Sequence, residues 1–269
     1  MDVAELKKKA SWLRREVLRS IYEGKRGHIG GTYSCVELLV ALYYGGILRI
    51  YPEQPRHELR DRFVCKGQPS LALYHIWVDL GILESSRLDE YGKDGSRLGA
   101  ELNIDTPGAE YDTGSLGNLL GVGAGMALAA KLDNKEYKTV VLMGDGECDE
   151  GSVWEAAMFA SRQELKNIVA IVDRNHLSVM DYVEEDKSGR LEDKFRACGW
   201  ECEVVNGHCF EDIFEAFSKS DGSVQPFAII ADTIKGKGVS FMENKFKWHH
   251  SVPGQQEYER AMHELGSVL

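Results

Sequence analysis

The feature that most constrains the fold is a series of short, mostly apolar segments that alternate with stretches of helical periodicity. The apolar segments span residues 139–143, 167–172, 201–205 and 227–231, and the helical stretches include 152–165 and 211–218. Apolar strands separated by helices of this length are typical of a parallel sheet that is covered on both faces. We therefore predict an α/β fold with a doubly wound, mainly parallel sheet flanked by helices, in a single domain over residues 1–269.

The charge and the apolar pattern argue against two classes of protein. The chain of 269 residues has 43 acidic and 32 basic side chains, which gives a formal net charge of −11 at pH 7. This balance disfavours a nucleic-acid-binding protein, because such a protein needs basic side chains against the phosphates. The sequence also contains no continuous apolar run of about 18 residues, the length that crosses a bilayer.

The basic N-terminal stretch is interpreted as an amphipathic helix rather than a targeting peptide. Its apolar residues, from Val3 to Ile21, recur at helical spacing with charged side chains between them. Acidic residues interrupt the stretch, whereas transit peptides are poor in acidic residues. We expect the chain to remain in the cytoplasm.

The six cysteines indicate neither a disulfide framework nor a zinc site. They are few for this length and include no Cys-x-x-Cys pair, so reduced thiols of a cytosolic protein are the simpler interpretation. One group contains residue types that bind metals, but its spacing matches no zinc pattern. It consists of Cys198, Cys202, His208 and Cys209.

Two polar residues stand where consecutive predicted strands end. Asp145 follows the strand at 139–143, and Asn175 comes 30 residues later, after the strand at 167–172. Because a single helix lies between these strands, a right-handed crossover can place them side by side, about 4.8 Å apart. Both side chains then project from one edge of the sheet, where a carboxylate and a carboxamide oxygen suit Mg²⁺.

The glycines on either side of Asp145 favour a phosphorylated ligand at the same place. Gly144 and Gly146 leave room for a diphosphate close to the backbone, and the helix that follows offers free N–H groups and a partial positive charge. Mg²⁺ seldom has only protein ligands, so phosphate oxygens and water would complete its coordination. A Gly-Asp-Gly triplet alone is a common turn. The whole unit of strand, triplet, helix, strand and asparagine favours a functional site.

This unit resembles the thiamine diphosphate motif of the transketolase family, and the resemblance extends over nearly the whole chain. The further segments are GHIGG at 27–31, DRFV at 61–64, TPG at 106–108, TGSLG at 113–117, KGKGV at 235–239 and WH at 248–249. The resemblance implies the thiamine-diphosphate-binding fold, specifically its diphosphate-binding domain. It also implies thiamine diphosphate and Mg²⁺ as cofactors.

The resemblance assigns roles to individual residues. The metal ligands would be Asp145, Asn175 and the carbonyl group of Leu177. The cofactor-binding residues would be Gln68, Gly114, Leu116, Gly144, Asp145, Gly146, Glu147, Asn175 and His249. The catalytic residues would be His28, which approaches the reacting carbon, His249, and Glu150, which lies at a subunit interface beside the pyrimidine.

Several of these residues have a structural alternative. His28 lies between glycines and could be a turn residue, and Glu150 could cap the helix that starts near Ser152. His249 and His250 could form a solvated pair. The glycine-rich stretch at 121–125 suggests a dinucleotide loop, but it does not follow an apolar strand, so close helix packing explains it better.

The chain ends about where the first domain of this family ends. The resemblance therefore implies the N-terminal subunit of a split transketolase, active only with a partner. The partner would contribute the pyrimidine-binding domain and the glutamate that activates the cofactor. Two copies of each chain, a heterotetramer, is the family expectation.

Two departures from the family pattern affect the substrate. Histidines expected around the diphosphate and the donor's hydroxyl groups are replaced by Gln68 and, in a gap-free alignment from Thr106, by Ala100. Glutamine can donate a hydrogen bond but cannot carry a proton, and alanine can do neither. The identity of the donor therefore does not follow from the resemblance.

The predicted function is transfer of a two-carbon ketol unit from a ketose, or ketose phosphate, to an aldehyde. One alternative is decarboxylating acyl transfer from a 2-oxo acid such as pyruvate, which the missing histidines favour and the flanks of His28 and Lys235 oppose. A second alternative is a non-catalytic relative that keeps the fold. An NAD-dependent dehydrogenase is disfavoured because the glycine loop lacks its strand.

Overall fold

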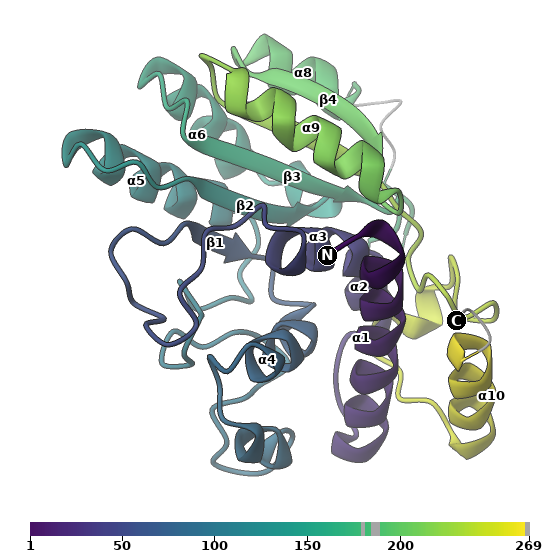
Figure 1. The fold of residues 1–269 in the computed structure, drawn as a ribbon. Helices are drawn as coiled ribbons and strands as arrows, with labels where there is room; N and C mark the ends of the chain where they lie inside the picture. Colours follow the sequence, from purple (N-terminus) through teal and green to yellow (C-terminus); the bar gives the residue numbers. More distant parts are fainter. Residues whose placement is uncertain (179–180, 184–188, 267–269) are drawn as a thin grey trace.

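The fold is a five-stranded parallel sheet, seen in a computed structural model that describes residues 1–178, 181–183 and 189–266. The strands are β1 (Arg62–Cys65), β2 (Thr139–Gly144), β3 (Ile168–Arg174), β4 (Glu201–Asn206) and β5 (Phe227–Asp232). They lie in the order β1-β2-β3-β5-β4, and every pair is parallel (Figure 1). The predicted fold class is confirmed, and each of the four strands expected from its apolar pattern runs one or two residues beyond its predicted end.

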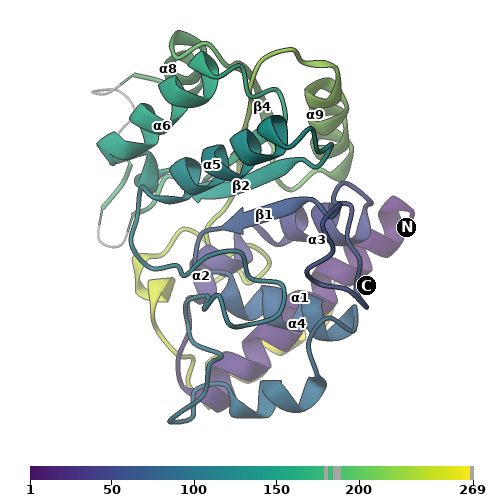
Figure 2. The same cartoon turned by 90° about the vertical axis from the view of Figure 1, so that its left-hand side faces the viewer.

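Helices cover both faces of the sheet (Figure 2). Each face has its own apolar core. One core joins the sheet to α5 (Leu119–Leu132), α6 (Gly151–Arg162) and α8 (Leu191–Ala197). The other core joins it to α1 (Val3–Gly24), α3 (Val36–Tyr44), α4 (Ser70–Asp79) and α9 (Phe210–Gly222). The remaining elements are α2 (Ile29–Tyr33), α10 (Gln255–Gly266), η1 (Ser85–Glu90), η2 (Gly146–Asp149) and η3 (Phe246–His249).

The N-terminal stretch forms the amphipathic helix that its periodicity predicts. Asp2 caps α1 in a reciprocal arrangement with Glu5, and the apolar side chains Leu6, Leu13 and Val17 are fully buried. Within the described ranges, no helix combines the length and the apolar character needed to span a bilayer.

The register of β2 and β3 brings the two predicted strand ends together. Gly144, the last residue of β2, is paired with Asp173 of β3, so Asp145 and Asn175 leave the sheet at the same edge. Every residue of β3 is buried, as expected for a strand covered on both faces.

Of the three glycines in the stretch 121–125, Gly123 permits the close helix packing that was predicted. A Cβ atom on Gly123 would lie 2.3 Å from Cγ2 of Val141 in β2, so this helix can approach the sheet only with glycine there.

After β2 the structure differs from the expectation that a helix follows the triplet directly. The short 3₁₀ turn η2 begins at Gly146, the last residue of the triplet, and α6 begins only at Gly151, so the first N–H groups beside the triplet belong to a 3₁₀ turn.

Candidate active site

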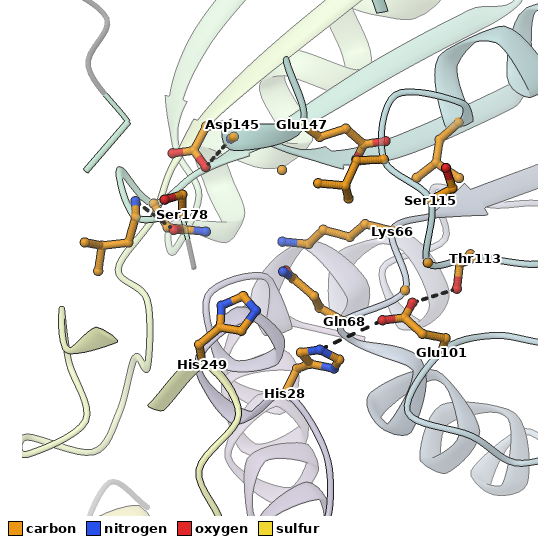
Figure 3. Close-up of a pocket in the computed structure, with 18 of the residues that line it drawn as sticks. His28, Lys66, Gln68, Glu101, Thr113, Ser115, Asp145, Glu147, Ser178 and His249 are labelled. Atoms are coloured by element: carbon orange, nitrogen blue, oxygen red, sulfur yellow. Dashed lines mark hydrogen bonds and ion pairs between the residues drawn. The ribbon is translucent and has the colours of Figure 1, made fainter. Parts of the chain in front are cut away.

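The predicted site residues surround one cavity of about 320 Å³ at the carboxyl ends of β1, β2 and β3 (Figure 3). Its lining includes all of them except Glu150. They are His28, Gln68, Gly114, Leu116, Gly144, Asp145, Gly146, Glu147, Asn175, Leu177 and His249. We call the part around Asp145, Asn175 and Leu177 the Asp145 end, and the part around His28, Glu101 and Thr113 the His28 end. Parallel sheets bind ligands at this edge, so the location fits a catalytic or binding site.

At the Asp145 end, backbone groups hold the carboxylate of Asp145. One oxygen accepts a hydrogen bond from the N–H of Gly146 at 2.9 Å, and the other from the N–H of His176 at 2.5 Å. Burial, and next to it the negative charge of Asp173, raises the pKa of Asp145 to about 6. The group is thus buried, oriented and next to another carboxylate, an arrangement that a bound cation would stabilise.

Asn175 is oriented by its neighbours in the same turn. Its Oδ1 atom accepts a hydrogen bond from the N–H of Leu177 at 3.2 Å, and its Nδ2 atom donates to Asp173 at 3.4 Å. The carboxamide is buried. Asn175 and Asp145 both line the cavity, where hard oxygen ligands could share one metal ion.

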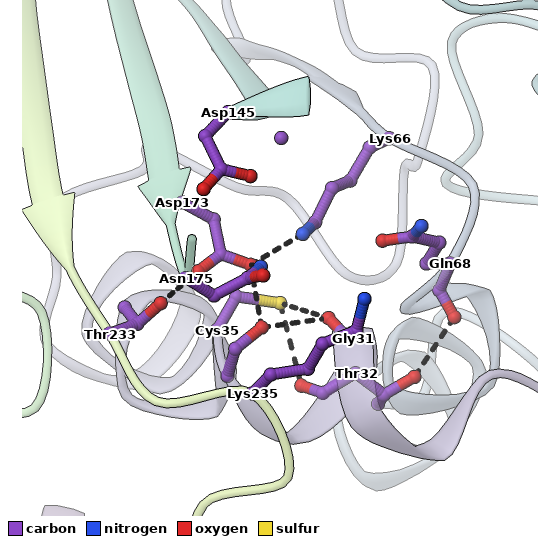
Figure 4. A network of polar contacts seen from close by, with 12 residues as sticks. Gly31, Thr32, Cys35, Lys66, Gln68, Asp145, Asp173, Asn175, Thr233 and Lys235 are labelled. Atoms are coloured by element: carbon purple, nitrogen blue, oxygen red, sulfur yellow. Dashed lines mark hydrogen bonds and ion pairs between the residues drawn. The ribbon is translucent and has the colours of Figure 1, made fainter. Parts of the chain in front are cut away.

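A buried polar network lies beneath the two strand ends (Figure 4). Asp173 is fully buried and accepts hydrogen bonds from Lys66, from Ser34 Oγ at 2.6 Å, and from Thr233. Burial alone would lower the pKa of Lys66, but the charge of Asp173 outweighs it and raises that pKa. The network joins three residues to β3: Lys66 follows β1, Ser34 follows α2, and Thr233 follows β5. Sequence analysis gave no role to Lys66 or Asp173, although both lie at strand ends.

Lys235 places a second buried cation at the Asp145 end. Its Nζ atom donates to the carbonyl oxygens of Leu177 at 2.9 Å and Ser178 at 2.8 Å, and it lies 3.2 Å from Nδ1 of His249. Burial, followed by the charge of Lys66, lowers the pKa of Lys235 to about 8. The carbonyl oxygen of Leu177, which was predicted to bind the metal, thus accepts a hydrogen bond from an ammonium group.

Three histidines converge on the cavity. His28 precedes α2, and its ring lies 5.5 Å from that of His249 and 3.9 Å from that of His250, centroid to centroid. His28 and His249 are buried and His250 is exposed, so His249 and His250 are not the solvated pair considered above. Burial and the neighbouring histidines lower the pKa of His28 to about 3, and burial and Lys235 lower that of His249 to about 4. Both rings are therefore neutral near pH 7.

The His28 end contains a carboxylate that the sequence analysis did not identify. Ala100 does not line the cavity, but the side chain of the next residue, Glu101, does (Figure 3). Glu101 accepts a hydrogen bond from Thr113 Oγ1 at 3.0 Å, and its other oxygen lies 3.9 Å from Nε2 of His28. Gln68 lines the wall between the two ends, and its Oε1 atom lies against Gly31.

Glu147 connects the triplet to the loop that carries Leu116. One carboxylate oxygen accepts a hydrogen bond from the N–H of Gly117 at 3.0 Å, and the other has no partner among the described residues. Burial raises the pKa of Glu147. Leu116 itself is 53% exposed at the rim of the cavity.

Glu150 lies outside the cavity. It is exposed and is the N-cap residue of α6, where its charge favours the helix dipole although its side chain makes no capping hydrogen bond, so the structural alternative stands. Nothing in the cavity tests its predicted place at a subunit interface.

The cysteine group considered above does not form a metal cluster. Cys198, Cys202 and Cys209 are free thiols, and the group of metal-binding side chains found in the described residues consists of His28, His249 and His250.

Comparison with known proteins identifies the family. Residues 6–268 match the model of the transketolase, thiamine diphosphate binding domain. The chain is 43% identical over its whole length to one subunit of the apulose-4-phosphate transketolase of Phocaeicola vulgatus, and the match covers 96% of that subunit. It is 35% identical to the 6-deoxy-6-sulfo-D-fructose transketolase subunit of a Clostridium species, over 97% of this chain and 96% of that protein.

A solved structure confirms the fold. The crystal structure of transketolase from Campylobacter jejuni matches 99% of this chain with a TM-score of 0.91 and 29% sequence identity. The match covers 43% of that longer chain, so the present chain corresponds to less than half of a single-chain transketolase.

Proposed function

The chain belongs to the transketolase family, and we propose that it is the cofactor-holding subunit of a two-subunit enzyme that transfers a two-carbon ketol unit from a ketose to an aldehyde. Both relatives compared above are named as subunits of transketolases, and each is named for a different ketose. These names support a ketose donor without fixing which one.

The observation that carries the proposal is the pairing of Asp145 and Asn175. They follow adjacent parallel strands, both are buried, and each is oriented by backbone hydrogen bonds toward one edge of the sheet. Two oriented oxygen donors beside a glycine-flanked cavity fit Mg²⁺ shared with a diphosphate.

The carbonyl group of Leu177 gives further support for a divalent cation at this end. The carbonyl oxygen of Leu177 accepts a hydrogen bond from the ammonium group of Lys235, so it already faces a positively charged group. Mg²⁺ at Asp145, Asn175 and Leu177 would take over this contact. Lys235 would then be free to bind a phosphate oxygen, together with His249 beside it.

The space between the donors fits a diphosphate. No atom lies within 4 Å of a Cβ atom built on Gly144, and a Cβ atom on Gly146 would meet Ser178 at 3.7 Å. Lys66 and Lys235 offset the negative charges of Asp145 and Asp173 at this end, and a bound divalent cation would supply the positive charge that the phosphates need.

Thiamine diphosphate, when bound, supplies a nucleophilic carbon and an electron sink, neither of which the side chains of this cavity provide. The chain's own contribution is orientation and proton transfer. His28 and His249 are neutral because burial lowers their pKa values, so each ring has one nitrogen able to accept a proton and one able to donate.

The partner subunit is proposed from three observations. Relatives of matching length are named as single subunits of transketolases, and the chain matches 43% of a single-chain transketolase. Leu116 and Glu150 are exposed next to the cavity, where a second chain could cover them. We propose that the partner contributes a pyrimidine-binding domain with the activating glutamate, and that Glu150 lies at this interface.

The proposal is tested on the chain combined with its partner, which an adjacent reading frame encoding a pyrimidine-binding domain would identify. Calorimetry should detect thiamine diphosphate binding with Mg²⁺ and none with EDTA, and the complex should consume xylulose 5-phosphate in the presence of an aldehyde. Cofactor binding without turnover of any ketose would support the non-catalytic alternative. Absence of cofactor binding in Mg²⁺ would contradict the proposal.

A further inference from the structure

The fold leaves space for the side chain of Glu101 at the His28 end and provides a hydrogen bond to it. A Cβ atom on Gly67 would lie 1.3 Å from Oε2 of Glu101, so the carboxylate occupies space that only a glycine at residue 67 leaves free. The same oxygen accepts the hydrogen bond from Thr113 Oγ1, and that hydroxyl oxygen accepts one from the N–H of Leu102 at 2.8 Å. The carboxylate is therefore held in the cavity by its surroundings.

The second oxygen of Glu101 is separated from His28 by a gap of defined size. Oε1 and Nε2 of His28 are 3.9 Å apart, which is too far for a direct hydrogen bond. A hydroxyl oxygen about 2.8 Å from each of these atoms fits between them. It would donate its hydrogen to the carboxylate and accept one from the Nε2–H tautomer of the neutral ring.

The charge of Glu101 is not balanced within the His28 end. In the part of the chain that the structure describes, its ion-pair contact is with His28, and burial and the nearby histidines keep that ring neutral by lowering its pKa to about 3. The nearby lysines have other partners, because Lys66 contacts Asp173 and Lys235 contacts two carbonyl groups. A negatively charged group of a substrate placed beside Glu101 would therefore be repelled.

We propose that Glu101 is a specificity-determining residue: with His28 it binds a hydroxyl group of a neutral, polyhydroxylated part of the donor, and it excludes donors that place a carboxylate there. This inference rests on the proposed function and deepens it. It selects ketoses over 2-oxo acids, because pyruvate lacks the hydroxyl group and adds a negative charge.

The test compares Glu101→Gln and Glu101→Ala with the unchanged chain, each in complex with the partner subunit. Glutamine keeps the shape but removes the charge, and alanine removes both. We expect KM for xylulose 5-phosphate to rise about 10- to 100-fold in Glu101→Ala, the range for losing a hydrogen bond to a charged group. In Glu101→Gln the rise should be smaller, and the inhibition constant of pyruvate as a competitor should fall because the repulsion between like charges is removed.

The matched control is Asp105→Asn. Asp105 is exposed on the same loop and pairs with Arg97 outside the cavity, so this variant removes a negative charge without touching the His28 end. Both constants should remain at their original values. Calorimetric Kd values for thiamine diphosphate should be the same in all four proteins, because Glu101 lies away from the Asp145 end.

The outcomes separate this inference from the proposed function. Normal cofactor binding and ketose turnover with unchanged KM in Glu101→Ala would overturn the role of Glu101 and leave the proposed function standing. A complex that prefers pyruvate as donor would also overturn it. A complex that binds no thiamine diphosphate, with or without these substitutions, would instead reject the proposed function.

Discussion

The two ends of the cavity differ in how they are built. At the Asp145 end, the side chains follow strands of one sheet, and backbone N–H groups and a buried network fix them. At the His28 end, the side chains come from separate loops and meet only through tertiary contacts. The first end keeps the residues of the family pattern, and the second departs from it. We therefore propose that the Asp145 end binds the cofactor as in the family and that donor recognition differs at the His28 end.

The ends also differ in charge. At the Asp145 end, Lys66 and Lys235 are buried beside the carboxylates of Asp145 and Asp173, whereas the ion-pair contact of the Glu101 carboxylate at the His28 end is, among the described residues, with a neutral histidine (Figure 3). With a divalent cation bound at the Asp145 end, this difference would orient a ligand with an anionic tail and a neutral, hydroxyl-rich head. Substitutions at one end should therefore change cofactor affinity, and substitutions at the other should change donor kinetics.

The largest effect is expected for Asp145→Ala. Loss of this oxygen donor should weaken Mg²⁺-dependent binding of thiamine diphosphate more than about 100-fold, since even outer partners of a metal site contribute 10- to 100-fold. Calorimetry on the complex measures this, and circular dichroism should show an unchanged fold. Asp149→Ala is the control, because Asp149 is exposed on η2 and does not line the cavity. Retained affinity in Asp145→Ala would refute the metal site.

The next effect is expected for Lys235→Met. It removes a buried positive charge near the diphosphate position but keeps an apolar side chain of similar length. Cofactor affinity should fall about 10- to 100-fold, as for other hydrogen bonds to charged groups. Lys237→Met is the matched control, since Lys237 belongs to the same segment but contacts Glu243, whereas Lys235 contacts two residues of the cavity wall. Equal affinities of the two variants would show that Lys235 does not bind the diphosphate.

A smaller effect, confined to the His28 end, is expected for Gly67→Ala. The new Cβ atom would overlap the carboxylate of Glu101 and displace it. KM for the ketose should rise about tenfold while the Kd of the cofactor stays the same. Gly125→Ala serves as control because no atom lies within 4 Å of a Cβ atom there. A loss of cofactor affinity in Gly67→Ala would break the proposed separation of the two ends.

Glu37 lies outside the cavity, so Glu37→Gln should change neither the affinity for the cofactor nor the kinetics of the donor. Glu37 accepts hydrogen bonds from Arg14 at 2.6 and 2.8 Å and contacts His208 at 2.8 Å. Leaving Arg14 buried without its partner should lower the free energy of unfolding by about 3–5 kcal/mol. Thermal unfolding measures this loss, and cofactor Kd at a temperature where the protein is folded should not change.

The same pair predicts a dependence of stability on pH. Burial tends to raise the pKa of Glu37, but the charge of Arg14 outweighs it and lowers that pKa to about 2, below the ordinary value of 4.5. The contribution of Glu37 is therefore complete above pH 4.5 and is lost as the pH falls toward 2. Glu37→Gln should lack this component of the acid sensitivity. Parallel stability curves for both proteins over this range would argue against it.

The Asp145 end could be predicted from the sequence because its geometry follows from local rules. A parallel crossover places consecutive strand ends together. The spacing of Asp145 and Asn175 was therefore sufficient to predict that they lie at the same edge of the sheet. Lys66 and Asp173 were missed because their contact joins residues 107 positions apart, which no local pattern encodes. Lys235 stood in a recognised segment, but its contact with Leu177 depends on the path of the chain after β5.

The His28 end was predicted less completely. The family resemblance predicted that His28 and Gln68 belong to the site. It placed the second replaced histidine at Ala100. In an irregular loop, neighbouring side chains point in different directions, and the structure turns Glu101 inward instead. A gap-free alignment cannot resolve a difference of one residue in such a loop.

The central claim is that Asp145 and Asn175 hold one divalent ion that binds the diphosphate of the cofactor. It is tested most directly by a crystal structure of the complex grown with thiamine diphosphate and Mn²⁺ in place of Mg²⁺. The account predicts one anomalous peak bonded to Asp145, Asn175, the Leu177 carbonyl and two phosphate oxygens, with Lys235 moved onto the diphosphate. A cofactor bound elsewhere, or a peak that touches neither Asp145 nor Asn175, would contradict it.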